Sequence, residues 1–144
     1  MPTNPKVRFR VDFDDQCSIG IGKIELLEGI ASSGSLSQAA RRMRMSYRRA
    51  WLLLADMNSS FDEPVARAST GGRGGGGAVL TGFGASLVAG YRKMESGLQP
   101  LADTYFHDVG KHVKPTRSPG RAKKAVPVAS IRRKPPIRSR PMDG

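Results

Sequence analysis

The sequence has a single cysteine, Cys17, so no disulfide can form within the chain. It also lacks long apolar stretches: none approaches the roughly 18 residues of a membrane-spanning helix. The first residues, MPTNPKVRFRVDFDD, have no apolar core of the kind found in secretory signals. We therefore expect a protein of the bacterial cytoplasm, with no membrane partner.

Side chains suited to catalysis or metal binding are equally scarce. The only histidines are His107 and His112, far along the chain from Cys17. The aspartates within residues 12–15 lack the spacing and the glycine of a calcium loop, and we interpret them as a strand end followed by a turn. Neither an enzyme activity nor a metal ion or cofactor is expected.

The charge is strongly positive and unevenly distributed. The formal net charge is +12 and the sequence pI is about 10.7, which suggests a polyanionic partner. Residues 107–144 contain eleven lysines and arginines against two aspartates, together with six of the ten prolines. We expect this segment to be a disordered basic tail that attracts phosphates, the alternative being a solvated extension with no partner.

The first part of the chain predicts a strand and then a helix. Residues 7–13 alternate between apolar and charged side chains, which is typical of a half-buried strand. A helix is expected over about residues 22–32, with Gly34 placed to end it. Its expected apolar face consists of Ile24, Leu27, Ile30 and Ala31.

The stretch SSGSLSQAARRMRMSYRRAW, residues 32–51, predicts two helices joined by a three-residue turn. Ser35 with Gln38 forms a capping box at the start of the first helix. Ser46 caps the second helix, which is expected to reach about Ser60. Two helices so joined form a helix-turn-helix. The residues expected to face the core from the second helix are Ala50, Trp51, Leu54, Met57 and Phe61.

Alanines and arginines have different expected roles in this motif. Ala39 and Ala40 allow its helices to cross closely, whereas the arginines lie on the outer faces and on the first turn of the second helix. In a DNA-binding protein that turn enters the major groove. An ordinary helical hairpin with solvated arginines is the alternative. The residues expected to contact DNA here are Ser35, Ser46, Tyr47, Arg48 and Arg49, with Arg48 the first choice for a guanine.

A glycine-rich hairpin follows. Strands are expected at Val65–Ser69 and Ala78–Thr81, which makes this hairpin a wing, with residues 7–13 as the third strand of its sheet. Arg73 and Gly74 at the tip are expected to meet a phosphate or a minor groove, the alternative being an exposed loop without a partner. The glycines also match G-x-G-x-x-G, but a strand follows them, so nucleotide binding is not expected.

The last predicted element is a long helix over about residues 81–106, capped by Thr81. Its apolar residues recur at steps of three and four up to Tyr105. This stripe exceeds what one small domain can cover, so part of it should meet a second copy; packing entirely on its own core is the alternative. Pro100 is expected to kink or break the helix. The residues expected at the dimer contact are Phe83, Leu87, Tyr91, Met94, Leu98 and Leu101.

This order of elements resembles the N-terminal DNA-binding domain of ModE-type molybdate-responsive regulators, which is itself similar to the LysR-type winged helix. The matching text is GKIELLEGIASSGSLSQAARRMRMSYRRAWLLLADMN and TGGRGGGGAVLTGFG, within about residues 6–95. The resemblance implies a homodimer that binds double-stranded DNA through paired recognition helices and wings. Full-length members carry a molybdate-binding region after this domain, whereas residues 107–144 here are a basic tail, so we do not expect oxyanion sensing by this chain.

Taken together, these features predict a mainly α protein with a small β-sheet: a winged helix-turn-helix domain over residues 1–106, with a long C-terminal dimerisation helix, and a tail over 107–144. The expected function is sequence-specific transcriptional regulation as a nucleoid-associated homodimer, with room for a separate effector-sensing protein as partner. Two alternatives stay open: an architectural DNA-binding protein with little sequence preference, and a module whose helix-turn-helix face binds protein.

Overall fold

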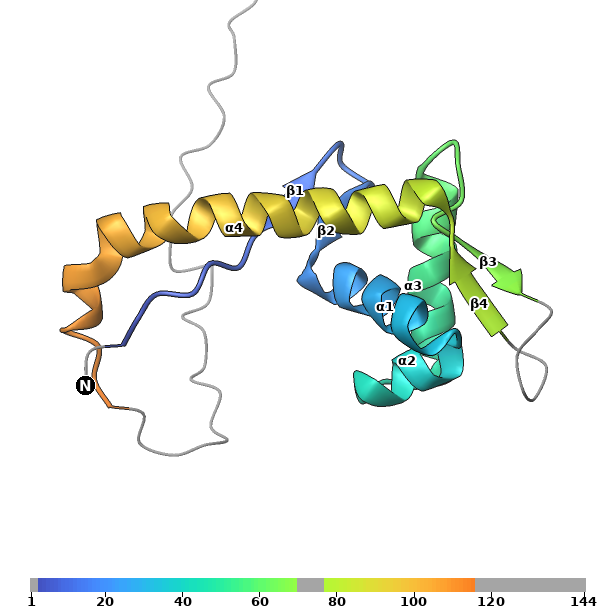
Figure 1. Cartoon of the computed structure of the whole chain (residues 1–144), viewed down its shortest axis with the longest axis horizontal. Helices are drawn as coiled ribbons and strands as arrows, with labels where there is room; N and C mark the ends of the chain where they lie inside the picture. Colours follow the sequence, from blue (N-terminus) through green and yellow to red (C-terminus); the bar gives the residue numbers. More distant parts are fainter. Residues whose placement is uncertain (1–2, 70–76, 116–144) are drawn as a thin grey trace, which may run out of the picture. The chain divides into compact units, whose positions relative to one another are not determined.

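The fold is mainly helical with a small antiparallel β part, which confirms the predicted fold class (Figure 1). The computed structural model describes residues 3–69 and 77–115. The elements, all within the compact unit Met1–Val113, are β1 (Arg10–Asp12), β2 (Ser18–Gly20), α1 (Ile21–Ser33), α2 (Leu36–Arg42), α3 (Tyr47–Ser60), β3 (Ala66–Ser69), β4 (Gly77–Leu80) and α4 (Gly82–Gly110).

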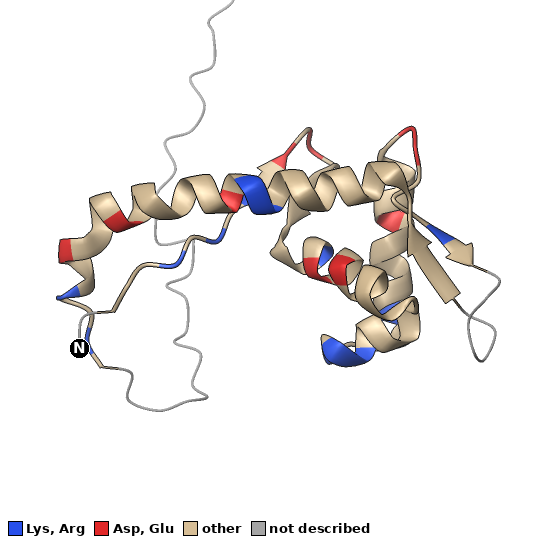
Figure 2. Cartoon of the chain, viewed as in Figure 1, with Lys and Arg blue, Asp and Glu red and all other residues tan. Residues whose placement is uncertain are grey.

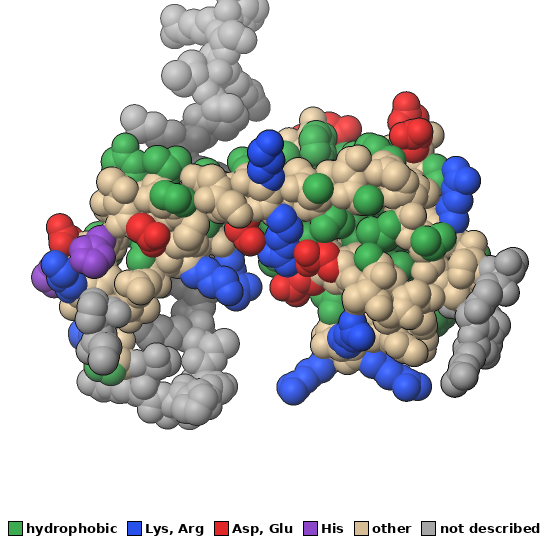
Figure 3. All heavy atoms as spheres, viewed as in Figure 1, with side chains coloured by type: hydrophobic (Ala, Val, Ile, Leu, Met, Phe, Trp, Pro, Cys, Tyr) green, Lys and Arg blue, Asp and Glu red, His purple; other side chains and the backbone are tan. Residues whose placement is uncertain are grey.

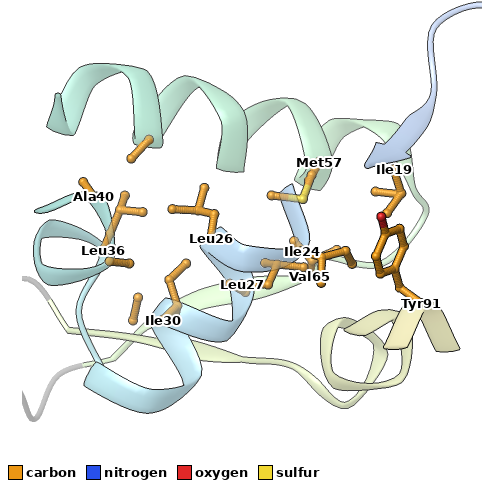
Figure 4. Packing of buried hydrophobic residues seen from close by; sticks show 14 residues of the cluster. Ile19, Ile24, Leu26, Leu27, Ile30, Leu36, Ala40, Met57, Val65 and Tyr91 are labelled. Carbon is orange, nitrogen blue, oxygen red and sulfur yellow. The ribbon is translucent and has the colours of Figure 1, made fainter. Parts of the chain in front are cut away.

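Helix α1 is the centre of the core. Four of its side chains are completely buried, because β2, α2, α3, β4 and α4 all pack around it. Figure 4 shows these side chains directed towards Met57 of α3, Leu36 of α2 and Val65. The predicted apolar face is right for Ile24, Leu27 and Ile30, but Ala31 is exposed and Leu26 is buried instead.

The tightest helix crossing lies between α1 and α2. A Cβ atom built on Gly29 of α1 would lie 2.9 Å from the Cβ of Ala39 on α2. The predicted close crossing at Ala39 therefore exists, but it joins α2 to the preceding helix. Helix α1 ends at Gly34, which has a φ of 69° and donates its N–H to the carbonyl of Ile30, as expected for a glycine in the left-handed region.

The prediction that residues 7–13 add a strand to the wing is wrong. Only Arg10–Asp12 forms a strand, and it pairs with β2, because the chain reverses at once through a turn in which the N–H of Phe13 bonds to the carbonyl of Cys17. The wing strands β3 and β4 pair with each other. Their additional partner is the connection between α1 and α2, through a bridge between Ser35 and Gly77.

The residues before β1 lie along α4 (Figure 1). The side-chain amide of Gln99 accepts a hydrogen bond from the N–H of Val7 and donates one to the carbonyl of Pro5. Phe9 stacks on Tyr91, with ring centroids 4.3 Å apart, and the hydroxyl of Tyr91 donates to the carbonyl of Phe9. Phe9, on the apolar side of the predicted strand, therefore packs against α4 and not against a sheet.

Helix α4 begins as predicted, with the hydroxyl of Thr81 accepting a hydrogen bond from the N–H of Gly84. It continues through Pro100 without a break and ends at Gly110, beyond the predicted boundary at residue 106. A proline removes one backbone donor, and a single lost bond is tolerated in a helix of this length. None of the helices in the described part of the chain has both the length and the apolar character needed to cross a bilayer.

Gly84 is the point where α4 packs against Val65, the residue before β3, and it provides a stability test. A Cβ atom at Gly84 would overlap the backbone carbonyl of Val65, whereas one at Gly90, on the same helix, would meet nothing within 4 Å. We expect Gly84→Ala to lower the free energy of unfolding by about 1–3 kcal/mol through overpacking. The matched control Gly90→Ala should raise it by up to about 1 kcal/mol. Chemical denaturation of both variants measures this, and equal effects would contradict the packing described here.

Candidate nucleic-acid interface

Helices α2 and α3 are each started by a serine, as the sequence predicts. The hydroxyl oxygen of Ser35 accepts a hydrogen bond from the N–H of Gln38, and that of Ser46 accepts one from the N–H of Arg49. The reciprocal half of the predicted capping box is replaced, because the N–H of Ser35 bonds to the hydroxyl of Ser33. These caps fix where α3 begins, and therefore which residues its first turn presents.

The turn between the two helices is a Schellman motif with an arginine in place of the usual glycine. Arg44 has a φ of 54°, and its N–H bonds to the carbonyl of Arg41 while the N–H of Met45 bonds to that of Ala40. This geometry reverses the chain within three residues. It also holds a cationic side chain at the tip of the turn, where glycine would offer none.

Five exposed arginines surround this turn. Among the described residues none of them forms an ion pair; one of them, Arg42, donates a hydrogen bond to the hydroxyl of Ser32. In Figure 3 basic side chains project from the edge of the molecule below α2. The five are Arg41, Arg42, Arg44, Arg48 and Arg49, and we call them the arginine cluster.

The acidic side chains lie elsewhere. No aspartate or glutamate occurs between Glu28 and Asp56, and these two are bound to other cations: Glu28 to Arg92, at 2.6 Å, and Asp56 to Lys23, at 3.0 Å. Figure 2 shows acidic positions on α1, on α4 and in the loops away from the end of α2. Among the described residues, therefore, no carboxylate beside the arginine cluster is left to cancel its positive field.

The predicted core position of Trp51 is wrong. Its side chain is 52% exposed, while Ala50 and Met57 are fully buried and Leu54 and Phe61 are partly buried. Trp51 follows Ala50 by one residue, or about 100° around the helix, so it turns away from the core that Ala50 faces. Trp51 follows Arg48 by three residues, and residues three apart share a helix face. The outward position expected for Arg48 would therefore have indicated that Trp51 is exposed.

The other predicted DNA-binding residues divide into two groups. Ser46, Tyr47, Arg48 and Arg49 come together on the exposed first turn of α3 and its cap, whereas Ser35 is half-buried at the start of α2, beside Gly77 of the wing. The remaining two, Arg73 and Gly74, lie outside the described residues.

The residues of α4 that were predicted to form the dimer contact differ in how far they are buried. Phe83, Leu87 and Tyr91 pack against the chain's own core. Met94 and Leu101 are about half exposed, and Leu98 is intermediate. Exposed apolar side chains continue beyond them, which Figure 3 shows along the distal part of α4; they are Tyr105, Phe106, Val109 and Val113.

Helix α4 is tied to the core by polar contacts as well. Arg92 bonds to both Glu28 of α1 and Glu95, and hydrogen bonds to these carboxylates raise the pKa of its guanidinium. Burial raises the pKa of the neighbouring Tyr91 hydroxyl, with Glu95 adding to the effect. The arrangement joins α4 to the central helix on which α2 and α3 also pack.

The backbone of Arg44 can be tested by two substitutions. A left-handed residue other than glycine costs roughly 1–2 kcal/mol. Both Arg44→Gly and Arg44→Ala remove the charge, but only glycine removes this cost. We therefore expect the glycine variant to be more stable than the alanine variant by about 1 kcal/mol in chemical denaturation. Equal stabilities would show that Arg44 is not held in the left-handed region.

Comparison with known proteins gives relatives that match the N-terminal part of the chain. It is 45% identical over 86 residues to the DNA-binding transcriptional dual regulator ModE of Escherichia coli strain K12, which is 60% of this chain and 33% of that protein. It is 38% identical over 96 residues to the molybdenum transport protein ModE of Azotobacter vinelandii, which is 67% of this chain and 36% of that protein. It is 40% identical over 87 residues to the molybdenum-pterin-binding protein MopB of Rhodobacter capsulatus, which is 60% of this chain and 32% of that protein.

The chain spans about a third of the length of these curated relatives. No family model matches it. Two of these three relatives have molybdenum in their names, and those called ModE include transcriptional regulators. The similarity thus supports the ModE-type family for the N-terminal part of the chain.

Proposed function

We propose that this protein is a sequence-specific DNA-binding regulator that acts as a homodimer. The observation that carries the proposal is the arginine cluster: five exposed cations, without ion pairs among the described residues, around the start of α3. A duplex offers the matching row of phosphates. The relatives named as DNA-binding or transcriptional regulators give independent support.

The arrangement of the side chains on α3 suits contacts with bases as well as attraction to phosphates. The buried side, centred near Ala50 and Met57, leaves Arg48 and Leu52 on the opposite, exposed side. Arginine at the start of a recognition helix binds the two acceptors of guanine in the major groove. Arg48 is therefore the proposed base-reading residue, and Arg49 and Tyr47 flank it towards the phosphates or a neighbouring base edge.

The positive end of the helix dipole adds to this arrangement. The N-terminal N–H groups of α3 carry a partial positive charge, and the cap at Ser46 leaves its own hydroxyl hydrogen available to an acceptor. A phosphate near this end is favoured by the dipole and by Arg49 together. Phosphate contacts fix the position of the helix, so that Arg48 meets a defined base.

Pairing of two copies through α4 would double this recognition. The exposed apolar side chains from Met94 to Val113 form a surface that the described part of the chain leaves uncovered. Two paired copies would place their recognition helices in successive major grooves, about 34 Å apart on one face of the duplex. The lysines and arginines that follow α4, from Lys111 onward, are proposed to add attraction to phosphates without reading sequence.

Arg48→Ala tests the reading role. The binding sites are first mapped across a genome, and affinities for a mapped site and for random duplex are then measured at one salt concentration. We expect the variant to lose about 5- to 160-fold in preference for the mapped site, since a bidentate guanine contact contributes about 1–3 kcal/mol. Lys93→Ala, which removes an exposed cation from α4, is the control and should leave the preference unchanged.

Two outcomes would count against the proposal. Equal weakening on both duplexes would reduce Arg48 to a phosphate contact. Uniform coverage of the genome, with no discrete sites, would favour an architectural protein over a regulator.

Leu101→Glu tests the pairing. Leu101 is 52% exposed within the apolar stripe, and a carboxylate there would be desolvated in a dimer. We expect the dissociation constant of the dimer, measured by sedimentation equilibrium, to rise at least about tenfold. Ser96→Glu places the same charge on the opposite, exposed side of α4 and should not change it. A wild-type protein that is monomeric at all concentrations would refute the dimer.

A further inference from the structure

The outer side of α3 carries a group of exposed apolar side chains that the arginine cluster does not explain. Trp51 and Leu52 are each 52% exposed, and Tyr47 is 56% exposed. Residues three and four apart share a helix face, so Arg48, Trp51, Leu52 and the half-buried Ala55 lie together. Single exposed apolar residues are ordinary, but several large ones on adjacent turns mark a contact surface.

The charges around this group indicate what covers it. Arg48 and Arg49 lie one helical turn before Leu52, and the first acidic residue of α3, Asp56, is paired with Lys23. An apolar protein surface placed here would have to desolvate unpaired guanidinium groups, which is costly. The major groove of a duplex has phosphates at its edges and, on its floor, one apolar group, the 5-methyl of thymine. Charge and apolar character therefore match a duplex together.

We infer that Leu52, with Trp51 beside it, reads thymine methyl groups in the major groove. This inference rests on the proposed function and assigns a second, apolar part to its recognition. Leu52 lies opposite the buried side of α3, as Arg48 does, one helical turn further on. Four residues span about 6 Å along a helix, or roughly two base-pair steps. The thymine read by Leu52 is therefore about two base pairs from the guanine read by Arg48.

The test removes single methyl groups from the DNA. In a duplex carrying a mapped site, each thymine is replaced in turn by deoxyuridine, which keeps base pairing and charge, and the affinity of the full-length protein is measured. At one or two positions we expect wild-type affinity to fall about three- to fivefold, the effect of one buried methyl. Leu52→Ala should bind the thymine site more weakly and lose its sensitivity to uracil at those positions.

Two further variants make the result specific. Arg48→Ala should keep the sensitivity to uracil, because it removes a different contact. Trp51→Ala should reduce the sensitivity at a thymine adjacent to the one that responds to Leu52→Ala. Since Leu52 and Trp51 are exposed, neither substitution should unfold the protein, and thermal unfolding monitored by circular dichroism verifies this.

The outcomes separate this inference from the function on which it rests. If the wild type prefers its mapped site but no uracil lowers its affinity, or if Leu52→Ala stays as sensitive as the wild type, Leu52 does not read a methyl and the regulator proposal stands. If Leu52→Ala leaves DNA affinity unchanged, the apolar group serves a protein partner instead. If no duplex is bound selectively, both proposals fail.

Discussion

The burial of α1 is the constraint on which the rest of the structure depends. Ile24, Leu26, Leu27 and Ile30 are completely buried, and this is possible only because elements on several sides of the helix cover them. Burying such a side chain contributes about 1.5–3 kcal/mol, so each covering element is held in place by contact with α1. Helix α2, helix α3, strand β4 and helix α4 thereby obtain fixed positions relative to one helix.

This arrangement allows the polar surface to be divided by charge. Because α1 and α4 share the ion pairs of Arg92, and α1 and α3 share the pair of Lys23 with Asp56, acidic groups are used within the body of the domain. The turn between α2 and α3 is left with cations alone. The left-handed Arg44 makes this turn short enough to concentrate them. Packing and electrostatics therefore favour the same surface.

Most of the helical architecture could be predicted because its signals are local. Ser35, Ser46 and Thr81 begin their helices as expected, since a hydroxyl capping an N–H two or three residues away depends on neighbouring residues only. The hairpin of β3 and β4 was recognisable from its glycines and flanking strands. The partner of β1 was not, because strand pairing is a contact between distant parts of the chain, and β2 is a strand of three residues without a recognisable pattern.

The sequence by itself determined where the helices begin, where the turn lies and where positive charge accumulates, because caps, helical periodicity and charge are properties of adjacent residues. Only the tertiary structure decided which apolar residues are covered. Leu26 is buried because five other elements pack against α1, whereas Trp51 lies on the exposed side of α3. A hydrophobic side chain does not specify its partner, and its burial depends on how distant elements pack together.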